Sequence, residues 1–237
     1  MDNETLTPKP PSSLDSMVSN VIRRIHEGKF RPSDQLPSEN EFAKEFNVAR
    51  GSVREAFKAL EALGILETSA GKRAKVGRLN GEVMSLMVNN AVETMQVSVQ
   101  QTLDLRRTLE IRTARIAALR RSEQSLGKIV NAARRMRLHR GDSVSQTAAD
   151  IDFHIAIAEA TGNPLYTVMI ESFRIVMEKT CPVGWNSRSS EAQRDAIFDM
   201  HDAIAEAIRQ QDANAAEQAM ALHFDNSVQF LIAAGIS

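Results

Sequence analysis

The sequence has few of the residues that several classes of protein depend on. It has one cysteine, Cys181, in 237 residues. This excludes an intramolecular disulfide framework and a cysteine-rich zinc site, and fits a reducing compartment. No apolar run approaches the roughly 18 residues of a membrane-spanning helix. The N-terminus also lacks the apolar segment of a secretion signal. We therefore expect a cytoplasmic protein without a membrane partner.

Aromatic residues are also scarce, at 5% of the chain, while 43% of the residues are hydrophobic. The abundant types are alanine, leucine, isoleucine, methionine, glutamate, glutamine and arginine, most of which favour helices. With 29 basic and 30 acidic side chains, the formal net charge is −1. This balance argues against general binding of polyanions but allows a local basic face. The composition predicts a mainly α protein with a real core.

Proline, glycine and the apolar pattern divide the chain into two domains. Residues 1–13 are polar and proline-rich, which predicts a mobile tail. Residues 14–76 form the first predicted domain, and 77–81 resemble a linker. Residues 82–237 have helical periodicity with short breaks, including Gly127 and 181–190. They predict an all-α antiparallel bundle of six or seven helices.

The first predicted domain has the pattern of a winged helix-turn-helix. Ser38 followed by Glu41 is a capping box, which predicts a helix that begins at Ser38. A short turn at 46–48 leads to a second helix, which Gly64 ends. Residues 65–76 then read as a short strand and a hairpin with a basic tip.

The second helix of this pair carries residues suited to reading DNA. Its N-terminal residues are expected in the major groove, where arginine bonds guanine and serine reaches phosphate. Arg50, Gly51, Ser52 and Arg54 occupy that end. Residues 50–78 hold seven basic and three acidic side chains. The alternative is a helical hairpin with ordinary solvated charges.

Several runs in this domain resemble the DNA-binding domain of GntR-type transcriptional regulators. They are Leu36-Pro37-Ser38-Glu39, Phe42-Ala43, Val48-Ala49-Arg50, Val53-Arg54-Glu55-Ala56 and Leu60-Glu61-Ala62-Leu63-Gly64. The resemblance implies DNA contacts from Ser38, Asn40, Arg50, Gly51, Ser52, Arg54, Gly71, Lys72 and Arg73. Two positions depart from the family pattern: Asn40 replaces a usual arginine, and Gly71-Lys72-Arg73 replaces Gly-x-Gly. They predict an altered operator sequence, with loss of DNA binding as the alternative.

In the predicted bundle, three histidines lie on apolar helix faces. They are His154, His201 and His223, and Asp150 precedes His154 by four residues on one helical face. A single histidine in such a place is more often a satisfied core residue. Three of them with a carboxylate suit a divalent metal, which satisfies buried imidazoles together. Zn²⁺ is the first expectation, with Ni²⁺, Mn²⁺, Co²⁺ or Fe²⁺ as alternatives.

The same region resembles the effector-binding helical (FCD) domain of the FadR-like branch of the GntR family. The resemblance rests on Leu105-Arg106-Arg107-Thr108-Leu109-Glu110, Asp150 with Phe153-His154, Ala160-Thr161-Gly162-Asn163-Pro164, His201-Asp202-Ala203-Ile204 and His223. It implies a metal held by Asp150, His154, His201 and His223. It also implies that Arg106 contacts an acidic effector. With the first domain, the resemblance covers about residues 14–233.

Three residues are candidates for effector binding, each with a simpler alternative. Arg106 has a surface or dimer salt bridge as its alternative. Asn163 equally suits a cap before Pro164. Trp185 lies in a predicted loop between helices, where an anchoring aromatic is the simpler interpretation.

Together the motifs predict a DNA-binding transcriptional regulator, by default a repressor. We expect a homodimer on palindromic half-sites, controlled by a small carboxylate or sugar acid at the metal site. One alternative is a metal-dependent hydrolase tethered to nucleic acid, which would need a general base such as Glu159. The other is a regulator that senses the metal itself.

Overall fold

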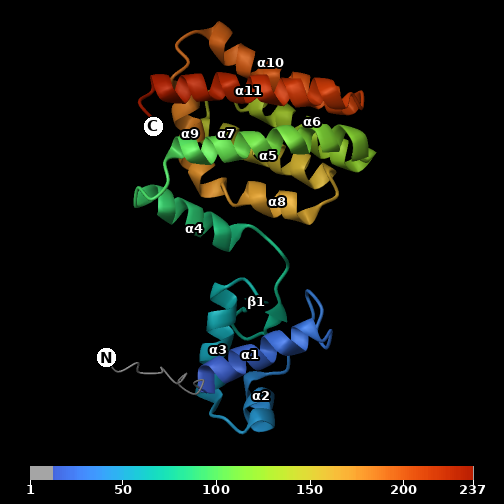
Figure 1. Ribbon diagram of the computed structural model, residues 1–237, viewed down its shortest axis with the longest axis vertical. Helices are drawn as coiled ribbons and strands as arrows, with labels where there is room; N and C mark the ends of the chain where they lie inside the picture. Colours follow the sequence, from blue (N-terminus) through green and yellow to red (C-terminus); the bar gives the residue numbers. More distant parts are fainter. Residues whose placement is uncertain (1–12, 237) are drawn as a thin grey trace, which may run out of the picture. The chain divides into compact units, whose positions relative to one another are not determined.

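The computed structural model describes residues 13–236, so most of the predicted mobile tail lies outside the described residues. The first helix, α1, already begins at Ser13. The chain divides after Leu79 into two compact units, which are described separately below. Figure 1 follows the chain from α1 in the first unit to α11 in the second.

The first unit has the helices and short strands of a winged helix-turn-helix. Its elements are α1 (Ser13–His26), α2 (Glu39–Phe46), α3 (Arg50–Ala62), β1 (Leu66–Glu67) and β2 (Lys75–Val76). The two strands pair antiparallel, with Leu66 opposite Val76. The apolar faces of the helices and the wing strands share one core, which includes Val21, Phe42, Phe57 and Leu60.

The turn between α2 and α3 follows from local sequence. The Ser38 side chain accepts from the backbone N–H of Glu41, and the Glu41 carboxylate accepts from the Ser38 backbone, which confirms the capping box. Asn47 ends α2 in the left-handed region, at φ 52°. Asparagine tolerates this conformation better than most residues. The turn therefore directs the N-terminal end of α3 outward.

The second unit is entirely helical in the part that the structure describes. Its helices are α4 (Glu82–Glu93), α5 (Val99–Arg120), α6 (Glu123–Leu138), α7 (Ser143–Ala160), α8 (Pro164–Glu171), α9 (Arg174–Asn186), α10 (Glu191–Arg209) and α11 (Ala213–Ala233). They number eight, whereas the sequence predicted six or seven. None of the described helices is long and apolar enough to span a membrane.

Of the predicted breaks in this unit, the one at Gly127 is wrong and the one at 181–190 is shorter than predicted, since only 187–190 lie outside a helix. Gly127 lies inside α6, and residues 181–186 form the last part of α9, with Pro182 inside the helix. Proline removes one backbone hydrogen bond from a helix interior. Burial of Val176, Met177 and Trp185 on the other elements stabilises α9 despite this loss. Trp185 is therefore a helical residue and not a loop residue.

The main core of the second unit lies between α5, α6, α7, α10 and α11. It contains Phe153, Ile157, Ile204 and Phe224, and Trp185 joins it from α9. In Figure 1, α5 and α11 lie side by side across this unit. α7 is buried between α5, α6 and α9. Side chains from several helices therefore meet along α7.

Candidate functional site

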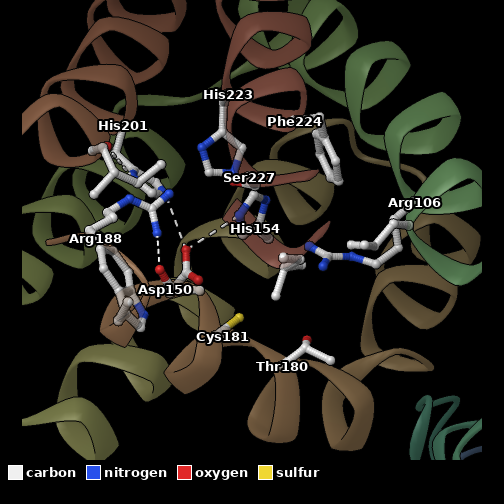
Figure 2. A pocket seen from close by; sticks show the side chains of 15 residues that line it. Arg106, Asp150, His154, Thr180, Cys181, Arg188, His201, His223, Phe224 and Ser227 are labelled. Carbon is white, nitrogen blue, oxygen red and sulfur yellow. Dashed lines mark hydrogen bonds and ion pairs between the residues drawn. The ribbon is translucent and has the colours of Figure 1, made fainter. Parts of the chain in front are cut away.

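The four predicted metal ligands come together inside the second unit. Asp150 and His154 are one turn apart on α7, while His201 is on α10 and His223 on α11. One nitrogen from each histidine lies within 4.8 Å of the others. Asp150 Oδ1 is 3.0 Å from His201 Nε2 and 3.4 Å from His154 Nε2. All four side chains are buried, and Figure 2 shows them converging on one space.

The hydrogen bond of His201 indicates which of its nitrogens faces this space. His201 Nδ1 lies 2.8 Å from the carbonyl oxygen of Ile197 and donates to it. In the neutral ring, Nε2 then carries the lone pair that points at the Asp150 carboxylate. A lone pair and a carboxylate oxygen at 3.0 Å need a proton or a cation between them. This donor set fits a divalent metal.

Glu110 on α5 is a buried carboxylate beside this cluster. Only 1% of its surface is exposed, and its Oε2 contacts His154 Nδ1. Its Oε1 accepts from Arg106 Nε at 2.9 Å. Glu110 therefore neutralises Arg106 and holds His154 with Nε2 toward Asp150. A carboxylate on the outer nitrogen of a ligand histidine orients the ring and makes it more basic.

The pKa directions agree with a cluster of opposite charges. Burial alone would lower the pKa of His154, but Glu110 and Asp150 outweigh it and raise this pKa to about 9. Burial would raise the pKa of Asp150, yet His154 and His201 hold it well below its usual value. Burial and the neighbouring histidines hold the pKa of His223 well below its usual value. His223 is therefore neutral, and its buried Nδ1 has no hydrogen-bond partner among the described residues.

The Glu110→Gln substitution is expected to weaken metal binding by about 10- to 100-fold, the usual effect of losing an outer-shell partner. The amide keeps the shape of the side chain but loses the charge that supports His154. The measurement is competition for Zn²⁺ against a chromophoric chelator. Glu159→Gln is the matched control, because Glu159 on α7 is half-exposed and pairs with Lys128 at 2.7 Å. Equal zinc affinity of the two variants would contradict the role given to Glu110.

The cluster lines a small cavity with about 50 Å³ of free space. Arg106, Trp185 and the four predicted ligands are among the lining residues. Figure 2 shows Arg106 on one side of the histidines and Arg188 on the other. Sequence reasoning missed Arg188, Glu110, Thr180 and Ser227. The spacing of four residues from Arg106 to Glu110, and from His223 to Ser227, was a usable signal for two of them.

Not every candidate belongs to this cavity. Asn163 is the N-cap of α8, where its side chain accepts from Leu165, and it is absent from the described lining. The structure therefore agrees with the alternative interpretation of Asn163 as a helix cap. Arg106 is buried against Glu110, so its surface-salt-bridge alternative is wrong. Glu159 lies outside the cavity and pairs with Lys128, so it does not provide the general base that a hydrolase would need.

The predicted DNA-binding residues form a surface on the first unit. A groove of about 560 Å³ is lined by both the start of α3 and the tip of the wing. Its lining includes Ser38, Asn40, Arg50, Arg54, Gly71, Lys72 and Arg73. Gly51 is exposed beside Arg50, with nothing within 4 Å of where a Cβ would lie, and Ser52 is half-buried. Seven of the nine candidates therefore line this groove, and Gly51 and Ser52 follow Arg50 in α3.

The arginines of this face are held by carboxylates. Glu39 accepts from Arg50 Nε at 2.8 Å and lies 3.4 Å from Arg54. Arg73 on the wing lies 3.4 Å from Glu41. Exposed ion pairs of this kind are worth only about 0–1 kcal/mol. DNA phosphates and base edges therefore compete easily for these arginines.

Two family profiles match the chain at these two sites. The profile of the bacterial regulatory proteins of the gntR family matches residues 15–76, and the FCD domain profile matches residues 101–226. The FCD match covers more than half of the chain. These matches define a DNA-binding regulator with a helical second domain. The chain belongs to the GntR family of bacterial transcriptional regulators.

Its relatives are named regulators rather than enzymes. The chain is 30% identical to the HTH-type transcriptional regulator LutR of Bacillus subtilis, over 85% of this chain and 93% of LutR. It is 30% identical to the galactonate operon transcriptional repressor of Escherichia coli, over 88% of this chain and 92% of that repressor. It is 28% identical to the HTH-type transcriptional repressor NanR of Citrobacter rodentium, over 92% of this chain and 85% of NanR. The hydrolase alternative is therefore not favoured.

A solved structure of a GntR protein from Streptococcus agalactiae has the same fold. It superposes with a TM-score of 0.65 at 21% identity, covering 90% of this chain and 97% of that one. This agreement supports the predicted winged helix-turn-helix followed by an all-helical domain.

Proposed function

We propose that this protein is a transcriptional repressor whose affinity for operator DNA is controlled by a small organic acid bound beside a metal ion. The observation that carries the proposal is the convergence of three buried histidines and Asp150 in a cavity that also has two arginines. Imidazole and carboxylate groups in this number leave positions open on a divalent metal. Arginine is the usual partner of a carboxylate.

The metal in this proposal is Zn²⁺, held by Asp150, His154, His201 and His223. When bound, it supplies open coordination positions for an oxygen of the acid. The chain itself supplies the orientation: Ile197 fixes the ring of His201, and Glu110 that of His154. Apolar side chains, among them Phe224 and Ile197, line part of the cavity.

The operator contacts in this proposal come from Arg50 and Arg54 at the start of α3, supported by the wing residues Lys72 and Arg73. One recognition helix reads only a few base pairs, so two copies on a palindromic site supply the affinity. The protein is accordingly proposed to act as a homodimer. The acid changes operator affinity only if it binds more tightly to one arrangement of the two DNA-binding domains than to the other, and so shifts the equilibrium between these arrangements.

The experiment measures operator affinity with and without the metal and an acid. A palindromic duplex recovered by in vitro selection with this protein serves as operator, and fluorescence anisotropy follows binding. Chelator-treated protein is compared with Zn²⁺-loaded protein, each titrated with malonate and with gluconate. We expect an acid to weaken operator binding only in the Zn²⁺-loaded protein, because the acid needs the metal.

Two other results would change the assignment. A change of operator affinity on adding Zn²⁺ alone, with no effect of any acid, would identify a metal-sensing regulator. Operator affinity that neither the metal nor any acid alters would contradict control through this cavity, while DNA binding by the first unit would stand.

A further inference from the structure

The cavity contains a second arginine whose charge is not neutralised as that of Arg106 is. Arg106 bonds the buried carboxylate of Glu110. Arg188 is 3% exposed, between α9 and α10, and no ion pair to it is found within residues 13–236. A buried guanidinium without a carboxylate is costly, because the loss of hydration is not offset by an opposite charge. Such a group is a candidate for binding an anion.

The groups in direct contact with the Arg188 guanidinium are neutral. It donates to the carbonyl of Gly184 and, at 3.0 Å, to the side-chain oxygen of Asn226. Its guanidinium lies over the Phe230 ring at 4.3 Å and over the Trp185 ring at 5.6 Å. Its buried Nε has no hydrogen-bond partner within the part of the chain that the structure describes. These contacts fix the group in place and leave it able to donate.

The charge of Arg188 survives its burial. Burial lowers the pKa of Arg188 to about 10, and the nearby charge of Asp150 opposes this shift. Arg188 is therefore a cation at neutral pH. A metal bound at Asp150 would compensate that carboxylate and so weaken its support for the charge of Arg188.

A count of charges around the cavity indicates which charge an anion there would need. Arg106 and Arg188 balance Glu110 and Asp150, so the four side chains sum to zero. A divalent metal with neutral histidines leaves a charge of +2. Two negative charges restore neutrality, and the two groups left to receive them are the metal and Arg188.

The free space limits the size of that partner. About 50 Å³ corresponds to roughly three to five water-sized positions. A six-carbon sugar acid exceeds this space, whereas an acid of three or four carbons approaches it.

We infer that the effector is a short dicarboxylate, with one carboxylate at the metal and the other bound by Arg188. This inference rests on the proposed function, because it needs an acid at the metal site. It assigns anion recognition to Arg188 and leaves Arg106 to hold Glu110 and, through it, His154. It also selects a short acid over a sugar acid.

The first test changes the charge of the ligand and leaves the protein unaltered. Zn²⁺-loaded wild-type protein is titrated by calorimetry with malonate and with its monoamide, malonamate. The two have the same shape, and the amide lacks one negative charge. A charged hydrogen bond of this kind supports a difference of about 10- to 150-fold in affinity. Equal binding of the two ligands would overturn the inference without any variant.

The second test removes the arginine. In Arg188→Gln, malonate is expected to bind about 10- to 150-fold more weakly, and the preference over malonamate is expected to disappear. Arg188→Lys keeps a charge and should keep part of the preference. Arg140→Gln removes an exposed arginine that pairs with Asp195 at 2.9 Å and serves as control. Zinc content and circular dichroism of each variant report on the metal site and on folding.

The outcomes separate this inference from the proposed function. A preference for malonate that persists in Arg188→Gln would show that Arg188 does not bind the anion. Binding of gluconate but not malonate to the wild type would leave an acid effector and refute the short dicarboxylate. Operator binding that no acid alters, in zinc-loaded protein, would refute the proposed function itself.

Discussion

A His201→Ala variant is expected to lose most of its bound metal, with a fall in zinc affinity of about 100-fold or more, above the range for an outer-shell partner. The ring orientation of His201 is set at both nitrogens, because Nδ1 is bonded to Ile197 and Nε2 faces Asp150. Alanine removes one of three nitrogens that lie within 4.8 Å of one another. The measurement is elemental analysis per subunit of protein purified without a His-tag or chelators.

His139→Ala is the matched control for this experiment. His139 is an exposed histidine at the end of α6 and does not line the cavity. The control is expected to keep the metal content of the wild type. Full metal occupancy in His201→Ala would refute the set of four ligands. Absence of metal from the wild type, even after incubation with Zn²⁺, Ni²⁺ or Mn²⁺, would make the histidines core residues or direct contacts of the acid.

An Arg50→Ala variant is expected to bind operator DNA more weakly by about 1–3 kcal/mol for each recognition helix, and by twice that for an operator read by two. Arg50 is 57% exposed at the first turn of α3. Its ion pair with Glu39 is also exposed and therefore contributes little free energy. The substitution should also relax the base preference at the position that Arg50 reads. Fluorescence anisotropy on the selected duplex and on single-base variants of it measures both effects.

Arg23→Ala separates this base contact from a general loss of charge. Arg23 is an exposed arginine of α1, 56% accessible and paired with Glu27 at 2.9 Å. The substitution removes the same charge from the same unit, but Arg23 does not line the groove between α3 and the wing. We expect this control to retain nearly all of its operator affinity. Unchanged affinity in Arg50→Ala would show that the start of α3 is not the reading surface.

The winged helix-turn-helix was predictable because its signals are local. The capping box at Ser38 fixes where α2 begins, and Gly64 in the left-handed region, at φ 70°, ends the region of α3. The apolar spacing along α3 places Val53, Phe57 and Leu60 in the core. These interactions join residues a few positions apart, so the sequence shows them directly.

The number and limits of the later helices were less predictable because packing decides them. Glycine and proline weaken a helix on their own, and Gly127 and Pro182 therefore read as breaks. In the structure, buried neighbours keep α6 and α9 continuous through these positions. Trp185 consequently reaches the cavity from a helix and stacks on Phe198 with ring centroids 5.5 Å apart.

The sequence by itself determined the helix-turn-helix with its predicted DNA-binding residues, the helical nature of the second domain and the four residues that meet in its cavity. Helical spacing joined Asp150 to His154, since a helix places residues four apart on one face, and the resemblance to the family's second domain added His201 and His223. Only the tertiary structure decided which charges are compensated. Arg106 forms an ion pair with Glu110, one turn away on the same helix. Arg188 lies between two helices and donates hydrogen bonds to Gly184 on α9 and to Asn226 on α11. The free energy of a buried charge depends on such distant neighbours, and these are fixed by packing rather than by position in the chain.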